Sequence, residues 1–217
     1  MKTLKANATK TTKKPIIQRL RTLNVKHIAL DLDDTICPFF PPFKEYLERK
    51  NKTKTNAKIN CSEYNFSKIF KINDLESKVL VSNFYDSPEF NQISPYIEAV
   101  KAIEILRKEG YKLSIVTGRQ NYAETQTKQF IESFIPNTFE DVHLTNSFSL
   151  EGEELSKYEI CKSINADILI DDNIRYCEEC SSKNITALVY GEYPWNKNSV
   201  HERLSANWEM CYHNKNP

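Results

Sequence analysis

Short apolar runs alternate along most of this chain with longer segments in which apolar residues recur at helical spacing. The short runs cannot form helices of their own and predict buried strands at 26–30, 111–116, 141–144, 166–170 and 185–190. The longer segments predict helices at 95–109, 122–135, 155–164, 174–182 and 199–208. Strands that alternate with helices imply an α/β, Rossmann-like fold, with a parallel sheet of about five strands and helices on both faces.

The alternation is broken once, by residues 41–90. This stretch is polar, rich in Lys and Asn, and interspersed with aromatic residues. Helices are expected at 44–50 and 66–84 and a loop at 51–60, whereas the proline-aromatic segment Cys37–Phe43 predicts a turn that is neither helix nor central strand. We therefore expect a core made of residues 25–40 and 91–217, with 41–90 inserted after the first strand as a small, mainly helical module.

Charge is distributed unevenly. Residues 1–24 are basic and contain no acid, which predicts a flexible, solvated N-terminal tail in which 15–23 could form a short helix; a mitochondrial presequence or a nucleic-acid or nuclear-import contact are the alternatives. Over the whole chain, 30 Lys and Arg against 29 Asp and Glu leave a net charge of +1, so no global field favours nucleic acid or membrane. Without a run of about 18 apolar residues, no membrane span is expected.

Six cysteines in 217 residues do not suggest a disulfide scaffold. Cys177 and Cys180 have the C-x-x-C spacing, but no second pair of cysteines or histidines accompanies them and they fall within a predicted helix. We interpret them as reduced thiols rather than as a metal or redox site. A reducing compartment, most simply the cytoplasm, is therefore expected.

Chemistry is concentrated where three predicted strands end. Asp31 and Asp33 follow the first strand, Thr117 the second, and Asp171 and Asp172 the fourth. The carboxyl ends of parallel strands meet at one edge of a sheet, which is where ligands bind in open α/β folds. Closely spaced carboxylates repel one another unless a cation lies among them, and a hard divalent ion with oxygen ligands, Mg²⁺ above all, suits that position.

The ordered set D-L-D-D-T, S-I-V-T-G-R, a lysine, and I-L-I-D-D-N resembles the four motifs of the haloacid dehalogenase (HAD) superfamily of phosphotransferases. The resemblance covers residues 25–190, and the ordered combination is more specific than any single motif. Within the superfamily, the layout is similar to the 5′(3′)-deoxyribonucleotidase group, also called cytosolic type C 5′-nucleotidases. It implies a Mg²⁺-dependent phosphomonoesterase in which the inserted module 41–90 is the cap.

The resemblance implies a role for each of the acidic residues. Asp31 would be the nucleophile that forms an aspartyl-phosphate, and Asp33 the general acid and base. Mg²⁺ would be bound by Asp31, by the backbone carbonyl of Asp33 and by the Asp171–Asp172 pair. We favour Asp172 as the direct ligand and Asp171 as a ligand through water.

The phosphoryl group would be held by the remaining motif residues. Thr117 would donate its hydroxyl and Gly118 its backbone amide, and Arg119 either contacts the phosphate or caps a helix. A lysine would place its charge on the phosphoryl oxygens. Lys157, at the start of the helix before the fourth strand, is the first choice for that lysine and Lys162 the alternative.

The substrate is less well defined by the sequence. Phe39 and Phe40 follow the nucleophile closely and could stack on a base, or could instead be part of the cap junction. The expected substrate is a small phosphomonoester such as a nucleoside 5′-monophosphate. The alternatives are a polynucleotide 3′-phosphatase, a phosphatase of the magnesium-dependent type acting on protein tyrosine or sugars, and a non-catalytic binding relative. The retention of both Asp31 and Asp33 argues against the last.

Overall fold

A computed structural model of the chain describes residues 16–51, 64–197 and 208. Three predicted segments lie partly outside these residues: 1–15 of the basic segment, 52–60 of the expected loop and 199–207 of the expected last helix. Helix α1 (Ile16–Thr22) and Trp208 lie within them. No helix in the described part of the chain is both long enough and apolar enough to cross a membrane.

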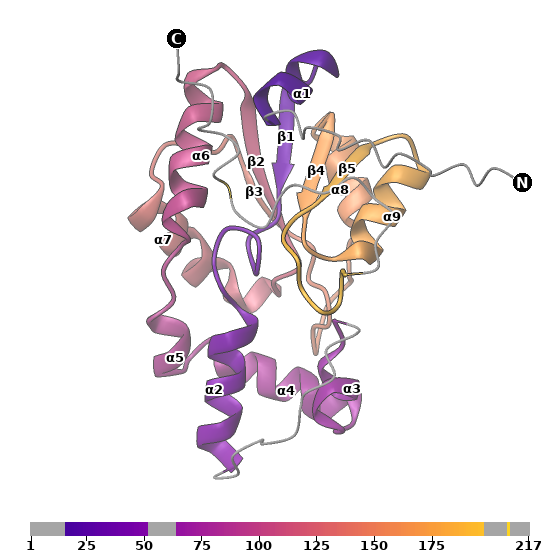
Figure 1. Cartoon of the computed structure of the whole chain (residues 1–217). Coiled ribbons are helices and arrows are strands. Elements are labelled where there is room, and N and C mark those ends of the chain that lie inside the picture. Colours follow the sequence, from indigo (N-terminus) through magenta and orange to yellow (C-terminus); the bar gives the residue numbers. More distant parts are fainter. Residues whose placement is uncertain (1–15, 52–63, 198–207, 209–217) are drawn as a thin grey trace, which may run out of the picture.

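The centre of the protein is a five-stranded parallel sheet (Figure 1). Its strand order is β3-β2-β1-β4-β5, so the first strand lies in the middle and is paired on both sides. The strands are β1 (His27–Leu30), β2 (Lys112–Thr117), β3 (Val142–Leu144), β4 (Ile168–Asp171) and β5 (Thr186–Val189). The expected α/β sheet is therefore confirmed, because each short apolar run forms a strand, half-buried in β3 and mostly buried in the other four.

Two layers of apolar side chains cover the faces of the sheet. Ile28 and Leu30 of β1 pack into one cluster with α6 (Ile97–Lys108) and α7 (Glu124–Phe134), whereas Ala29 packs into a second cluster with α8 (Lys157–Ser163) and α9 (Ile174–Ser182). This division follows from the alternation of side chains along a strand. Helices therefore cover both faces of the sheet, and ligands bind at the strand ends in folds of this kind.

The described part of the inserted module contains four helices, which lie beyond the carboxyl end of β1 (Figure 1). They are α2 (Phe40–Asn51), α3 (Phe66–Phe70), α4 (Asp74–Phe84) and α5 (Pro88–Asn91). Aromatic rings fill the space between them, with Phe43 contacting Phe66 at 4.8 Å and Phe84 at 5.2 Å between ring centroids. The module therefore has its own apolar interior and stands over the edge where the acidic residues lie.

The turn predicted at Cys37–Phe43 is wrong in its second half. Helix α2 begins at Phe40, and Pro41 and Pro42 lie in its first turn, where backbone N–H groups have no partner within the helix and proline is tolerated. The buried carboxylate of Asp34 accepts hydrogen bonds from the amides of Phe39 (2.9 Å) and Phe40 (3.1 Å). Asp34 thus anchors the start of α2 in place of a capping residue next to the helix.

The short helix expected at 15–23 within the N-terminal segment is present. Residues Ile16–Thr22 form helix α1, at the end of the sheet opposite to the cap (Figure 1). Leu20 on this helix is completely buried in the larger apolar cluster. The helix that places this leucine in the core is therefore part of the folded domain.

Candidate active site

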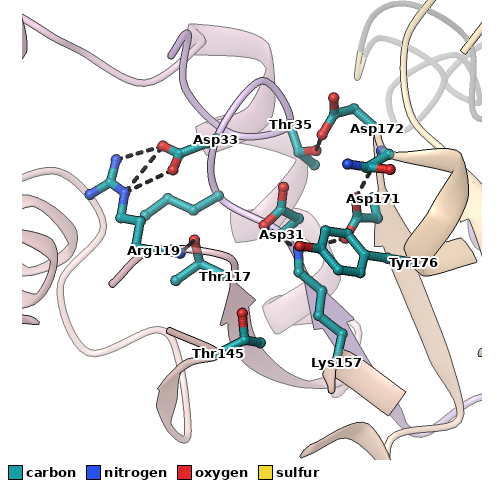
Figure 2. Close-up of polar contacts among 12 residues, drawn as sticks. Asp31, Asp33, Thr35, Thr117, Arg119, Thr145, Lys157, Asp171, Asp172 and Tyr176 are labelled. Carbon is teal, nitrogen blue, oxygen red and sulfur yellow. Dashed lines mark hydrogen bonds and ion pairs between the residues drawn. The ribbon is translucent and has the colours of Figure 1, made fainter. Parts of the chain in front are cut away.

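Three buried carboxylates meet at the carboxyl ends of the two central strands. Asp31 directly follows β1, Asp171 is the last residue of β4, and Asp172 follows it. One carboxylate oxygen from each lies within 4.8 Å of the other two, and all three side chains are buried (Figure 2). Because β1 and β4 are neighbours in the sheet, the residues that end them are brought side by side, as the strand-end pattern predicted.

Lys157 lies between two of these carboxylates. Its Nζ donates to Asp31 Oδ1 and to Asp171 Oδ2 (Figure 2), at 2.6 Å each, and only 1% of its side chain is exposed. The Tyr176 ring lies 4.5 Å from the same Nζ. Lys162, the alternative lysine, is exposed and lies over the ring of Tyr158. The structure therefore places Lys157, and not Lys162, among the acidic residues.

Burial makes this group of charges unfavourable without a further cation. Burial raises the pKa of Asp31 to about 8; Lys157 opposes the shift, whereas Asp171 and Asp33 add to it. Burial also raises the pKa of Asp172 well above its usual range, with Asp171 adding to the effect. For Lys157, burial lowers the pKa, but Asp171 and Asp31 outweigh it and the net change is upward. One lysine thus compensates the carboxylates only in part.

Asp172 is fixed by residues that the motifs did not reveal. Trp195 Nε1 donates to Asp172 Oδ2 at 2.7 Å, and the Asn196 side chain donates to the Asp172 carbonyl at 2.9 Å. Thr35 makes a longer contact, 3.4 Å, with Oδ1 (Figure 2). Trp195 and Asn196 therefore brace this carboxylate, which is how outer residues orient a metal ligand.

Asp33 points away from the three carboxylates, toward Arg119. Arg119 Nη2 donates to Asp33 Oδ1 at 2.7 Å, and Nε donates to Oδ2 at 3.0 Å (Figure 2). The side chain of Asp33 is thus outside the cluster, in keeping with an expected metal contact through its carbonyl only. Burial alone would lower the pKa of Arg119, but the neighbouring Asp33 carboxylate has the larger effect, so the pKa of Arg119 is raised. Arg119 does not extend toward Asp31.

A cavity of about 330 Å³ opens between this cluster and the cap. Asp31, Asp33, Lys157 and Asp172 line its floor. The walls are built from both core and cap: Phe39, Tyr64, Asn65, Phe66, Ser67, Asp74, Ser77, Lys78, Val81, Tyr85, Gly118, Arg119, Gln120, Ser147, Phe148, Asn173 and Tyr176. This volume is at the lower end of the range for small-molecule pockets.

The remaining predicted residues divide into those at the cavity and those behind it. Gly118 and Phe39 line it, whereas Phe40 does not and packs on Phe66 and Trp195. Thr117 is completely buried at the end of β2, and its Oγ1 accepts a hydrogen bond from the Arg119 amide at 3.3 Å. The second phenylalanine therefore belongs to the cap junction, which the sequence left open as an alternative.

Tyr176 is a further cavity residue that the sequence reading missed. Its ring covers Lys157, and its hydroxyl donates to Ser147 Oγ at 3.1 Å. Ser147 is in turn 2.8 Å from the hydroxyl of Thr145, which follows β3. Tyr176 is the third residue of α9 and belongs to no recognisable sequence motif, so its contact with Lys157 is evident only from the fold.

Comparison with known proteins identifies the fold. No protein-family model and no curated protein sequence matches the chain. Solved structures do match the chain. One is a hydrolase of the haloacid dehalogenase-like family from Streptococcus pneumoniae, which matches with a TM-score of 0.64 and 12% sequence identity, over 85% of this chain and 95% of that chain. A predicted phosphatase from Clostridium acetobutylicum matches at a TM-score of 0.62 and 15% identity, over 83% and 93%.

A protein provisionally described as a phosphoglycolate phosphatase, from Lactobacillus delbrueckii subsp. bulgaricus, matches with a TM-score of 0.61 and 12% sequence identity, over 85% of this chain and 95% of that chain. At such low identity, a shared structure defines the fold alone. The chain therefore has the HAD-like fold. Nothing in the comparison singles out the 5′-nucleotidase group.

Proposed function

We propose that this protein is a Mg²⁺-dependent phosphomonoester hydrolase of the HAD type that works through an aspartyl-phosphate at Asp31. The observation that carries the proposal is the environment of Asp31: a buried carboxylate on the floor of a cavity, with Lys157 on Oδ1. Among the described residues, no donor lies within hydrogen-bonding distance of Asp31 Oδ2. That oxygen is left to attack a phosphorus atom.

The donor set fits a hard divalent cation. Asp31, Asp171 and Asp172 supply only carboxylate oxygens, and burial together with their mutual repulsion raises the pKa values of Asp31 and Asp172, which supports a cation among them. Asp171 is already engaged by Lys157 and by the Asn173 amide, at 2.6 and 2.8 Å. This supports Asp31 and Asp172 as the direct ligands. When bound, Mg²⁺ would neutralise charge on the phosphoryl oxygens.

The proposed reaction has two steps. Asp31 Oδ2 attacks the phosphorus while the bond to the leaving oxygen breaks, and this oxygen keeps the electron pair and takes a proton from Asp33. Water then attacks the phosphorus of the aspartyl-phosphate, Asp33 accepts a proton from it, and the bond to Oδ2 breaks to release phosphate. Lys157 stays beside the reacting carboxylate and places a positive charge near the phosphoryl group in both steps.

The cavity supports a small substrate, with a nucleoside 5′-monophosphate as the first candidate. It lies between the floor carboxylates and the cap and has aromatic walls in Phe39, Tyr64, Phe66 and Tyr85 on which a base can stack. A cavity of about 330 Å³ beneath a cap fits a small phosphorylated metabolite better than it fits a polynucleotide end or a protein side chain on its backbone.

A panel of phosphate esters tests this function. With millimolar Mg²⁺, the purified protein is expected to hydrolyse p-nitrophenyl phosphate, and to give a higher kcat/KM on deoxyribonucleoside 5′-monophosphates than on 3′-phosphorylated oligonucleotides, phosphotyrosine peptide or sugar phosphates. The Asp31→Asn protein, purified in parallel, reports contaminating phosphatase. Preference for the oligonucleotide or the peptide would contradict the substrate class. Absence of turnover on every ester would contradict the proposal that this protein is a phosphatase.

Divalent cations should also stabilise the fold, and more so at higher pH. Because the folded pKa of Asp31 is raised above its unfolded value, to about 8, the folded state without Mg²⁺ binds more protons than the unfolded state and loses stability as pH rises from about 4 to 8. A cation takes the place of that proton. Saturating Mg²⁺ should raise Tm by roughly 5–10 °C at about pH 8 and by less at about pH 5.

Thermal unfolding with and without Mg²⁺ measures this shift. Asp172→Asn should remove most of it, whereas Asp86→Asn, at an exposed carboxylate outside the cavity, should keep it in full. An equal shift in wild type and Asp172→Asn would show that Mg²⁺ binds elsewhere.

A further inference from the structure

Arg119 holds the side chain of Asp33 through a fork of hydrogen bonds. Its Nη2 donates to Asp33 Oδ1 at 2.7 Å, and its Nε lies 3.2 Å from Oδ1 and 3.0 Å from Oδ2. The thiol of Cys37 makes a weaker contact with Oδ1, 3.8 Å long. Paired hydrogen bonds of this kind fix the direction of a carboxylate as well as its position.

The guanidinium is itself fixed on its other sides. Arg119 Nη1 donates to Thr127 Oγ1 at 3.1 Å, and the hydroxyl of Thr127 donates to the Ala123 carbonyl at 2.7 Å. The rings of Phe90 and Phe130 lie 5.1 and 5.9 Å from the guanidinium carbon. None of the Arg119 side chain is exposed. An arginine held on so many sides cannot extend to a phosphoryl group at Asp31.

Both residues line the cavity, but only Asp33 presents exposed side-chain surface to a substrate. Its side chain keeps 15% of its surface exposed, and it lines the cavity together with Asp31. Oδ1 accepts two hydrogen bonds from the guanidinium, whereas Oδ2 accepts one. A carboxylate oxygen has two lone pairs, so Oδ2 retains one for a ligand in the cavity.

We propose that Arg119 is the positioning residue for the acid–base carboxylate, directing Asp33 Oδ2 at the leaving-group oxygen rather than binding the phosphate itself. This inference rests on the proposed phosphatase function. Arg119 acts only through Asp33: in the first step, Asp33 gives its proton to the oxygen that leaves phosphorus with the electron pair of the broken bond. Losing the fork leaves the carboxylate free to rotate, so proton transfer becomes less frequent while phosphoryl binding is unchanged.

The dependence on leaving group tests this role. An alkyl alkoxide needs a proton as it departs, whereas p-nitrophenolate departs without one. Arg119→Gln should therefore lower kcat on an alkyl phosphate by about 10²–10³-fold and on p-nitrophenyl phosphate by less than about 10-fold. KM should change little, because Arg119 does not touch the substrate. The ratio of the two kcat/KM values does not depend on how much of the variant is folded.

Three further variants complete the test. Asp33→Asn should show the same discrimination between the two esters, and its combination with Arg119→Gln should add little, because both remove one function. Arg119→Lys, with a single donor group, should recover part of the alkyl phosphate rate. Arg107→Gln, an exposed arginine outside the cavity, should match wild type.

The outcomes separate this inference from the proposed function. If wild type hydrolyses both esters and Arg119→Gln loses the same factor on each, the positioning role is wrong. A rise in KM with unchanged kcat would instead make Arg119 a substrate ligand, which also overturns the inference. If wild type hydrolyses neither ester, the proposed function itself has failed.

Discussion

Asp31→Asn is expected to reduce turnover of p-nitrophenyl phosphate on the order of 10⁴-fold or more, because an amide cannot form the aspartyl-phosphate. The substitution keeps the shape of the side chain and the contact of Oδ1 with Lys157, so the fold should persist. Removing a buried carboxylate whose pKa is raised to about 8 should even relieve repulsion, and Tm without Mg²⁺ should not fall. Steady-state rates and thermal unfolding measure both effects.

Asp141→Asn is the matched control for this variant, because that carboxylate is exposed and precedes β3 without lining the cavity. It should retain wild-type rates. If Asp31→Asn keeps a tenth or more of the wild-type rate, another group is the nucleophile or water attacks phosphorus directly.

Lys157→Met should have the second largest effect, on both stability and rate. The lysine bridges Asp31 and Asp171 with 1% of its side chain exposed, and its loss leaves three buried carboxylates without an internal cation. Breaking a buried ion pair from one side costs about 3–5 kcal/mol, or roughly 10–15 °C in Tm. The turnover rate should fall about 10²–10³-fold, because the positive charge beside the phosphoryl group is lost.

Lys162→Met provides the matched control on the same helix. Lys162 is exposed, so its replacement should change neither Tm nor rate appreciably. The loss of stability in Lys157→Met should also be smaller at about pH 5 than at about pH 8, because Asp31 then carries a proton and repels its neighbours less. Equal effects of the two substitutions would remove Lys157 from the site.

The sheet and the carboxylates at its edge could be predicted because their signals are local. A short apolar run that ends in acidic residues gives both the strand and its exit, and parallel topology then brings Asp31 and Asp171 to neighbouring strand ends. The choice between Lys157 and Lys162 also had a local signal. Lys157 shares a helix face with the buried residues Ile160 and Cys161, and Lys162 does not.

Residues that act through distant partners could not be predicted in this way. Trp195 reaches Asp172 from a loop after the last strand, and Tyr176 covers Lys157 from a helix that carries no motif. Arg119 lies in a motif, yet its direction is set by Asp33, Thr127 and aromatic rings from separate segments. Such contacts depend on how helices, strands and loops pack against one another, and local patterns in a single sequence do not reveal that packing.

Direct capture of the covalent intermediate is the most direct test of the account. The protein is quenched with acid during turnover of a phosphate ester and treated with borohydride, which reduces an aspartyl-phosphate to homoserine, and its peptides are then sequenced by mass spectrometry. We predict conversion at position 31 alone, and only when substrate and Mg²⁺ are both present. Phosphate release without conversion at position 31, or conversion at Asp172 instead, would contradict the assignment of Asp31 as the nucleophile.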